Sequence, residues 1–369
     1  MELLRVTYHL DVDEASAEAR AEAMAREQTV EVPREVALRD PVVAREALGR
    51  VEKLEEDPEG GIRATLAYPV ATTALDVAQF LNVVFGNSSL HDDVRCLDID
   101  PPPSLLAALG GPCFGVPGLR RATGAVGRPL TCTAIKPMGL ATPALAALAG
   151  TFARAGIDVV KDDHGLADQP WSPFRERVRA CLGAVERAAD ETGHRTVYAP
   201  NLIGTPRRVL DALRYAEDAG VRAVLVSPML IGLPFFSELC QRRASVPVLA
   251  HPAFGGALRF APEALFGRLL RLLGADAVIF VSFGSRFRQS EQSCRRIADG
   301  LRCPWGHLLP SLPVPAGGVT LASAQKVVEA YGRDAMLLVG GDLQVDEGGV
   351  LERSRRFVEA VRDAAAGLP

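Results

Sequence analysis

The sequence predicts an α/β protein in which a C-terminal (β/α)8 barrel, or TIM barrel, follows a smaller N-terminal α+β domain of the ferredoxin-like kind. From about residue 130, short Val/Ile/Leu-rich runs alternate with Ala/Arg/Leu/Glu-rich amphipathic segments, whereas residues 1–120 follow another pattern. The 369 residues suit a barrel of roughly 200–250 residues plus a second module. A doubly wound open sheet is the weaker alternative.

The N-terminal region combines the two periodicities of strands and helices. Apolar and polar residues alternate in 3–12, 27–36, 50–57 and 61–70, which predicts strands of a mostly antiparallel sheet. Residues 16–27 and 73–86 show the helical pattern. The Pro- and Gly-rich stretch 98–120 is typical of a linker. We therefore expect one domain at 1–120 and the barrel domain at 121–369.

The barrel region contains eight candidate strands, one for each unit of a closed barrel. They lie at 130–137, 157–163, 196–202, 223–228, 246–252, 277–282, 308–318 and 335–341. Helical patterns lie between them, for example at 143–156, 207–220 and 322–332, and each of these three ends in a glycine. Glycine commonly closes a helix in a left-handed turn, so the strand–helix rhythm is supported at its boundaries.

Composition excludes several classes of function. Hydrophobic residues make up 48% and charged residues 23%, and no apolar run is long enough to span a membrane. The first residues do not follow a signal-peptide pattern, so we expect a cytoplasmic protein. Seven cysteines stand singly, without the spacing of a disulfide framework or zinc site. A net charge of −4 gives no indication of a basic surface that would bind nucleic acid or an anionic membrane, so the expected partners are small molecules.

Polar residues and glycines gather where the predicted barrel strands end, which is where TIM barrels place their active sites. In "KDDH", alternation along a strand should point Lys161 and Asp163 into the barrel mouth and Asp162 away. A structural ion pair between Lys161 and Asp163 is the alternative, but other strands also end in polar groups: Lys136, Asn201 and His251. Gly317–Gly318 and Gly340–Gly341 end the last two strands and favour phosphate binding over simple turns.

Six stretches resemble, in order and spacing, the signature blocks of the ribulose bisphosphate carboxylase (RuBisCO) large-subunit superfamily. They are "GRPLTCTAIKPMGL", "AGIDVVKDDHGLADQPWSPFRERV", "VYAPNLIG", "AHPAFGGAL", "PVPAGGV" and "LLVGGDLQ". The similarity runs through the whole chain. It implies an N-terminal domain, a C-terminal barrel and a homodimer whose active sites lie between one barrel and the partner's N-terminal domain.

The resemblance also implies residue roles. Lys161 matches the lysine that reacts with CO2 to give a carbamate, Asp163 matches a Mg²⁺ ligand and Lys136 matches a proton-shuttling lysine. We expect catalytic roles for Lys136, Lys161, Asn201 and His251, phosphate or substrate binding by Gly317, Gly318, Gly340, Gly341, Glu27 and Asn87, and a metal held by Lys161, Asp163 and His164. Glu27 and Asn87 would reach the site of the neighbouring subunit.

The carbamate has a clear chemical purpose, because it converts a cationic side chain into an oxygen ligand that Mg²⁺ prefers. Neighbouring aspartates should favour the ammonium form of Lys161, so we expect the metal to trap the carbamate. His164 replaces the family's third ligand, a glutamate. This nitrogen ligand should weaken Mg²⁺ binding and favour Mn²⁺ or another divalent metal relatively more.

Other departures point away from CO2 fixation. Met138 stands where a second lysine is expected, Pro252 replaces the arginine that holds the second phosphate, and Ala316 replaces a serine there. The loop "VSFGSRFRQ" lacks the lysine that steadies the incoming CO2, and Arg286, the nearest cation, differs from an ammonium in geometry. The resemblance is therefore to RuBisCO-like, non-carboxylating members.

The remaining groups suit formation of an enolate, whose developing charge a cation stabilises directly. The resemblance implies a metal-dependent isomerase or tautomerase of a ketose phosphate, such as 5-methylthioribulose 1-phosphate in methylthioadenosine and sulfur salvage. Alternatives are an enolase of 2,3-diketo-5-methylthiopentyl 1-phosphate and a decarboxylase of a 3-oxo sugar-acid phosphate. A non-catalytic binding or regulatory protein that has lost the metal site is the alternative outside enzymes.

Overall fold

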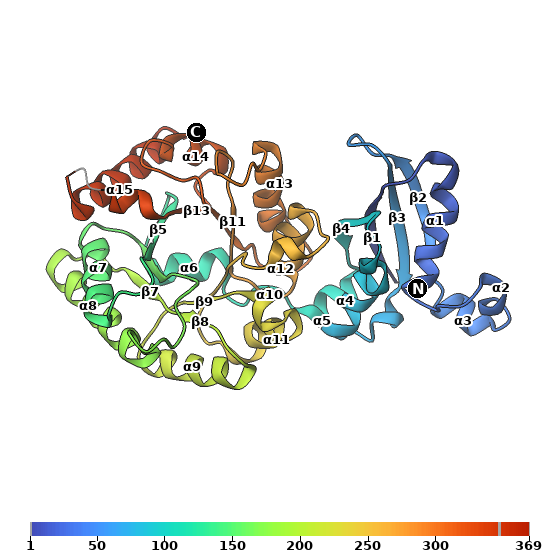
Figure 1. Ribbon diagram of the computed structural model, residues 1–369, viewed down its shortest axis with the longest axis horizontal. Coiled ribbons are helices and arrows are strands. Elements are labelled where there is room, and N and C mark those ends of the chain that lie inside the picture. The colour runs from blue at the N-terminus through green and yellow to red at the C-terminus, as the bar shows by residue number, and fades with distance from the viewer. Residues whose placement is uncertain (1, 346–347, 369) are drawn as a thin grey trace.

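The N-terminal part of the computed structural model is built on one antiparallel sheet (Figure 1). The structure describes residues 2–345 and 348–368. Strands β1 (Leu3–Leu10), β2 (Arg50–Glu56), β3 (Ile62–Pro69) and β4 (Val94–Asp100) pair in the order β2-β3-β1-β4. Helices α1 (Glu14–Glu27), α2 (Arg34–Ala37), α3 (Pro41–Glu46), α4 (Val77–Phe85) and α5 (Pro103–Leu109), with 3-10 turns η1 (Val70–Thr73) and η2 (Asn87–Leu90), complete this region.

The structure differs from the expectations for this region in two respects. No strand forms over 27–36, because α1 extends to Glu27 and α2 begins at Arg34. The side chain of Gln28 donates to the carbonyl of Val83, and Glu31 takes a left-handed backbone conformation, with φ of 52°, which interrupts an extended chain. Strand β4 was not expected.

Strand β4 also joins the sheet to the barrel. The Cys96 N–H donates to the Arg259 carbonyl at 3.0 Å, and the Ala261 N–H donates to the Cys96 carbonyl at 2.8 Å. The predicted linker 98–120 contains α5 and most of α6 (Gly115–Thr123) rather than open chain. The division at residue 120 stays a prediction, and α6, which spans it, adds Val116 and Leu119 to the cluster inside the barrel.

Each of the eight expected barrel strands contains an observed strand, and the strands are parallel. They are β5 (Leu130–Ile135), β6 (Val159–Asp162), β7 (Val197–Ala199) with β8 (Asn201–Leu202), β9 (Val224–Val226), β10 (Val248–Ala250), β11 (Ala277–Val281), β12 (Leu312–Ala316) and β13 (Met336–Val339). Pro200, which has no N–H, separates β7 from β8. Strand β13 pairs with β5 and contacts β12, so the sheet closes into a barrel.

Helices surround the barrel in Figure 1. The ring comprises α7 (Thr142–Arg154), α8 (Phe174–Thr192), α9 (Pro206–Asp218), α10 (Pro228–Ile231), α11 (Leu233–Glu238), α12 (Leu270–Leu272), α13 (Glu291–Arg302), α14 (Ala324–Tyr331) and α15 (Val350–Ala366). The π-helical segments are η3 (Leu239–Arg243) and η5 (Glu263–Leu269), and the 3-10 turns are η4 (Gly255–Ala257) and η6 (Gly341–Gln344). In the part of the chain that the structure describes, no helix combines the length and apolar character needed to cross a bilayer.

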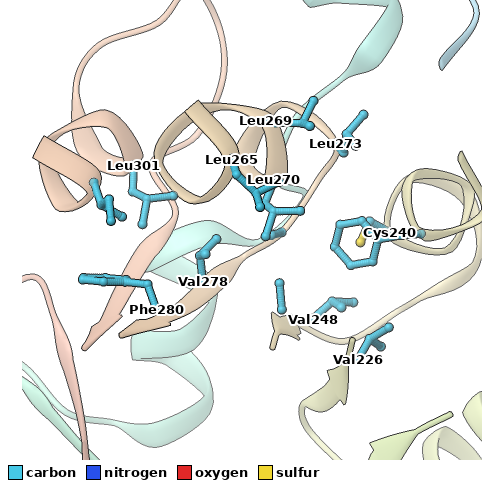
Figure 2. Close-up of a cluster of buried hydrophobic side chains, with 14 of the residues drawn as sticks. Val226, Cys240, Val248, Leu265, Leu269, Leu270, Leu273, Val278, Phe280 and Leu301 are labelled. Carbon is cyan, nitrogen blue, oxygen red and sulfur yellow. The ribbon is translucent and has the colours of Figure 1, made fainter. Parts of the chain in front are cut away.

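The barrel separates two apolar cores. Figure 2 shows part of the outer core, where Val226, Val248 and Val278 of neighbouring strands lie beneath Leu265 and Leu270 of the covering helical turns. The inner core fills the barrel with the alternate residues of the same strands. A residue's place in this alternation therefore decides whether its side chain faces the barrel interior.

Candidate active site

The polar residues at the barrel mouth continue the inward-facing rows of the inner core. Val159 belongs to the inner core and Val160 to the outer core, so Lys161 and Asp163 follow the inward row. The same two-residue step leads from Ala199 to Asn201 and from Leu249 to His251, and two such steps lead from Cys132 to Lys136. The structure thus brings the polar groups of four strands to one mouth.

Lys161 is held in a buried environment that favours its neutral amine. The residue is 3% exposed, and its Nζ donates to the backbone carbonyl of Asp162 at 3.0 Å. Burial is the main cause that lowers the pKa of Lys161, and the charge of Lys136 acts in the same direction. The charges of Asp163 and Asp162 act in the expected direction, since both raise the pKa of Lys161 and favour the ammonium form, but burial outweighs them and the pKa is lowered overall.

Asp163 is the charged centre of the mouth. Its Oδ2 lies 2.8 Å from Lys136 Nζ, and its Oδ1 lies 3.1 Å from His164 Nδ1 and accepts the Gly165 N–H at 3.0 Å. Burial acts to raise the pKa of Asp163, but the hydrogen bonds from His164, Lys136 and Gly165 together lower it well below its usual range. The side chain is therefore a carboxylate with both oxygens engaged.

His164 and His251 meet face to face across the mouth. Their ring centroids are 4.2 Å apart, with 12° between the planes. Burial, followed by the charges of Lys161 and His164, lowers the pKa of His251 to about 2, so this ring is neutral. Its Nδ1 accepts the Ala253 N–H at 3.1 Å, which leaves the proton of the neutral ring on Nε2.

Asn201 fixes the loop that carries the candidate metal ligands Asp163 and His164. Its Nδ2 donates to the carbonyls of His164 and Leu166, both at 2.9 Å. Its Oδ1 is buried and has no hydrogen-bond partner among the described residues, which is rare for a buried polar atom. A cleft of about 860 Å³ opens beside Asn201, between the loop that follows β6 and the start of α9.

Asp162 points away from the mouth, into a buried network that sequence reasoning missed. Its Oδ2 lies 3.1 Å from Arg177 Nε, with both side chains fully buried, and its Oδ1 accepts from Tyr198 Oη at 2.6 Å. Arg177 also donates to the carbonyls of Ser172 and Ala167. The available signal was the position of Arg177 in the apolar stripe of α8, with Phe174, Val178 and Cys181.

The two glycine pairs differ in the space around their backbone. Gly317 has φ of 79°, and a Cβ on Gly318 would lie 2.9 Å from Ser285 N, so glycine lets the loop after β11 approach. A Cβ on Gly340 or Gly341 would meet no atom within 4 Å. The backbone at β13 thus borders open space of the kind that a phosphate cradle requires.

Glu27 and Asn87 lie together but outside this mouth. Asn87 Nδ2 donates to Glu27 Oε1 at 3.0 Å and lies 3.4 Å from Glu31 Oε1. Among the hydrogen bonds and ion pairs of residues 2–345 and 348–368, none joins Glu27 or Asn87 to the barrel. Within one chain the structure therefore does not bring them to the site.

The expected metal ligands form a complete set of donors only if Lys161 is carbamylated. Among the described residues, no group of three or more His, Cys, Asp and Glu side chains is arranged for a metal ion. Asp163 and His164 supply two donors, and unmodified Lys161 supplies none. A carbamate on Lys161 would add oxygen donors beside Asp163. Asn201, on the neighbouring strand, has an Oδ1 that is buried without a hydrogen-bond partner among the described residues.

The departures from the carboxylases remove positive charge from the mouth. Met138 is 54% exposed, and its sulfur accepts a weak hydrogen bond from Gln169 Nε2 at 3.7 Å. The guanidinium of Arg286 stacks over the Phe287 ring at 4.9 Å. Pro252 and Ala316 have no charge to offer a second phosphate.

Comparison with known proteins places these features in a family. Residues 115–349 match the model for the ribulose bisphosphate carboxylase large chain, catalytic domain. The chain is 43% identical over 364 residues to a 5-methylthioribulose-1-phosphate isomerase of Rhodospirillum rubrum, covering 98% of this chain and 97% of that protein. It is 32% identical over 340 residues to a 2,3-diketo-5-methylthiopentyl-1-phosphate enolase of Geobacillus kaustophilus, covering 89% and 82%.

A solved structure agrees with the fold over the whole chain. The crystal structure of a Rubisco-like protein from Rhodopseudomonas palustris superposes with a TM-score of 0.91 and 40% sequence identity. The match covers 100% of this chain and 99% of that one.

Proposed function

Because this chain belongs to the ribulose bisphosphate carboxylase large-chain family, we propose that it is a non-carboxylating, RuBisCO-like isomerase of a ketose monophosphate. The first candidate substrate is 5-methylthioribulose 1-phosphate, which the name of the Rhodospirillum rubrum relative suggests. One observation carries the proposal: Lys136 is paired with Asp163 beside the buried amine of Lys161. Positions 252 and 316 of the same mouth hold the uncharged residues Pro252 and Ala316. Such a site suits proton transfer next to a ketone and a single phosphate.

The reaction needs a proton moved between neighbouring carbons. A base removes a proton beside the ketone, the C–H electron pair becomes a C=C bond, and the carbonyl oxygen takes the negative charge. A proton then returns to the former carbonyl carbon, while the neighbouring hydroxyl oxygen passes its proton to the former carbonyl oxygen and becomes the new carbonyl. In our proposal Lys136 holds and returns this proton at Nζ, within hydrogen-bond distance of Asp163. Neutral His251 orients a substrate oxygen through Nε2–H, and the glycine loops at β12 and β13 bind the phosphate.

A metal would complete the site, held by carbamylated Lys161, Asp163 and His164. The neutral amine of Lys161 attacks CO2, the new N–C bond leaves an oxyanion, and the amine releases one proton to solvent. Burial supports this step because it favours the free amine. When bound, Mg²⁺ or another divalent ion would polarise the ketone and stabilise the charge that develops on oxygen.

We propose a homodimer with shared active sites and a cytoplasmic location. Asn87 is exposed, and Glu27 beside it contacts no barrel residue of its own chain through any hydrogen bond or ion pair that joins the described residues. This placement leaves both side chains available to a partner's barrel mouth.

Isotope exchange tests the proposed activity. With 5-methylthioribulose 1-phosphate, Mg²⁺ and bicarbonate in D2O, we expect an isomeric sugar phosphate that carries deuterium next to its carbonyl, without CO2 release. Proton NMR and mass spectrometry of the product provide the measurement. Conversion only of 2,3-diketo-5-methylthiopentyl 1-phosphate would instead identify an enolase. Release of CO2 from a 3-oxo sugar-acid phosphate would identify a decarboxylase. Phosphate binding without exchange on any of these compounds would support a binding protein.

His164→Glu tests the metal assignment. A carboxylate in place of imidazole should raise Mg²⁺ affinity, because a hard cation prefers charged oxygen. Calorimetric titration with Mg²⁺ in bicarbonate measures the change. His307→Glu, at an exposed position outside the mouth, makes the same charge change and should leave the affinity unaltered. Unchanged or weaker Mg²⁺ binding in His164→Glu would contradict a metal position beside His164.

A further inference from the structure

An exposed aromatic side chain follows the active-site histidine of β10. Phe254 is 64% exposed and has a left-handed backbone, with φ of 68° and ψ of −1°. A bulky residue in this conformation is a true outlier, and its exposed ring loses apolar burial. Among the ring–ring contacts of the described residues, none involves Phe254. Two unfavourable features without a compensating ring–ring contact in the described part of the chain point to a role outside the folding of the chain.

The turn that carries Phe254 is anchored to the catalytic mouth. Ala253 N–H donates to the ring of His251, and Gly255 N–H donates to the Pro252 carbonyl at 2.9 Å. Gly255 is enclosed, since a Cβ there would lie 3.0 Å from Phe266 and 3.2 Å from Met229. His251 in turn stacks on His164. The Phe254 ring is thus displayed at the rim by a turn fixed at both sides.

The chemistry of this part of the rim is apolar. Residues 251–258, "HPAFGGAL", contain no lysine or arginine, and the next arginine, Arg259, donates to the Asp92 carbonyl at 2.8 Å. The helix that follows the neighbouring strand β9 carries Leu230, which is 46% exposed. In the sheet, β11 separates β10 from β12, so this turn and the Gly317–Gly318 loop occupy different parts of the rim. A ligand held by its phosphate at the glycine loops therefore meets an apolar surface elsewhere on the rim.

We propose that Phe254 is a specificity-determining residue that contacts the alkylthio end of the substrate, opposite its phosphate end. This inference rests on the proposed function, since it assigns the second end of the same substrate. The thioether and its methyl group are apolar and polarisable, and they make favourable contacts with an aromatic ring. Binding there covers the exposed ring and favours a methylthio group over a second phosphate or a hydroxyl.

Binding of unreactive analogues tests the subsite independently of turnover. The full-length protein and its Phe254→Ala and Phe254→Leu variants are titrated calorimetrically with 5-methylthiopentitol 1-phosphate and with 5-deoxypentitol 1-phosphate, which lacks the thioether. Wild type should prefer the methylthio compound by roughly 10-fold to 200-fold, the range for a small apolar group in a pocket. Phe254→Ala should lose most of this preference and keep its affinity for the deoxy compound, whereas Phe254→Leu should restore much of the preference. Phe, Ala and Leu all carry a Cβ, so the conformational cost of the left-handed backbone at position 254 is comparable in the three proteins.

The control is Val126→Ala, at an exposed position between α6 and β5, which should leave both affinities unchanged. Equal weakening of both analogues by Phe254→Ala would overturn the proposal, as would an undiminished preference. A Phe254→Ala protein that loses its wild-type oligomeric state in light scattering would also overturn it, because Phe254 would then belong to a subunit contact. Failure of the isotope-exchange experiment with intact thioether selectivity would reject the isomerase and leave the subsite standing.

Discussion

Lys136→Ala is expected to slow deuterium exchange into the substrate by about 10²–10⁴-fold, the usual contribution of a general acid–base group. The side chain lies 2.8 Å from Asp163 and is 40% exposed, so its removal opens no buried cavity. Binding of a sugar phosphate should persist, because the glycine loops belong to β12 and β13 and not to β5. Exchange by NMR and binding by calorimetry separate the two effects.

Lys326→Ala is the matched control for this substitution. Lys326 is an exposed lysine on α14 that pairs with Glu291, and its loss should leave both exchange and binding unchanged. If Lys136→Ala loses binding and exchange together, its ammonium holds the phosphate and the role proposed for it is wrong. Normal exchange in Lys136→Ala would mean that another residue is the general acid–base group.

Asp162→Ala is expected to be the most destabilising change near the site, at about 3–5 kcal/mol. It leaves the guanidinium of Arg177 buried without its carboxylate and removes the acceptor of Tyr198 Oη. The Asn201 N–H, which donates to Asp162 at 3.1 Å, loses its partner as well. Chemical denaturation followed by circular dichroism measures the change in the free energy of unfolding.

Asp211→Ala provides the comparison for an exposed pair. Asp211 lies 3.8 Å from Arg214 on α9, with both side chains more than half exposed, so its removal should cost less than about 1 kcal/mol. The double variant Asp162→Ala/Arg177→Met should cost less than the two single changes added together, because each single change leaves a charge unpaired. Additive costs would mean that the ion pair contributes no coupling.

The barrel and the row of mouth residues could be predicted from the sequence because both depend on local periodicity. Alternation in "DVVKDDH" was enough to expect Lys161 and Asp163 on one side of β6 and Asp162 on the other, and the inner and outer cores show that phase. The same periodicity misled at residues 27–36. There the Gln28 contact with Val83 and the left-handed backbone of Glu31 interrupt the extended chain. Neither feature can be recognised from the alternation of apolar and polar residues.

The sequence by itself determined the fold class, the family resemblance and the identity of the polar residues that end the strands, because these follow from spacing along the chain. Only the tertiary structure decided how those groups act on one another. The stacking of His164 on His251 joins β6 to β10, and the pairing of Lys136 with Asp163 joins β5 to β6. The lowering of the Lys161 pKa likewise comes from its burial, which many distant residues create together.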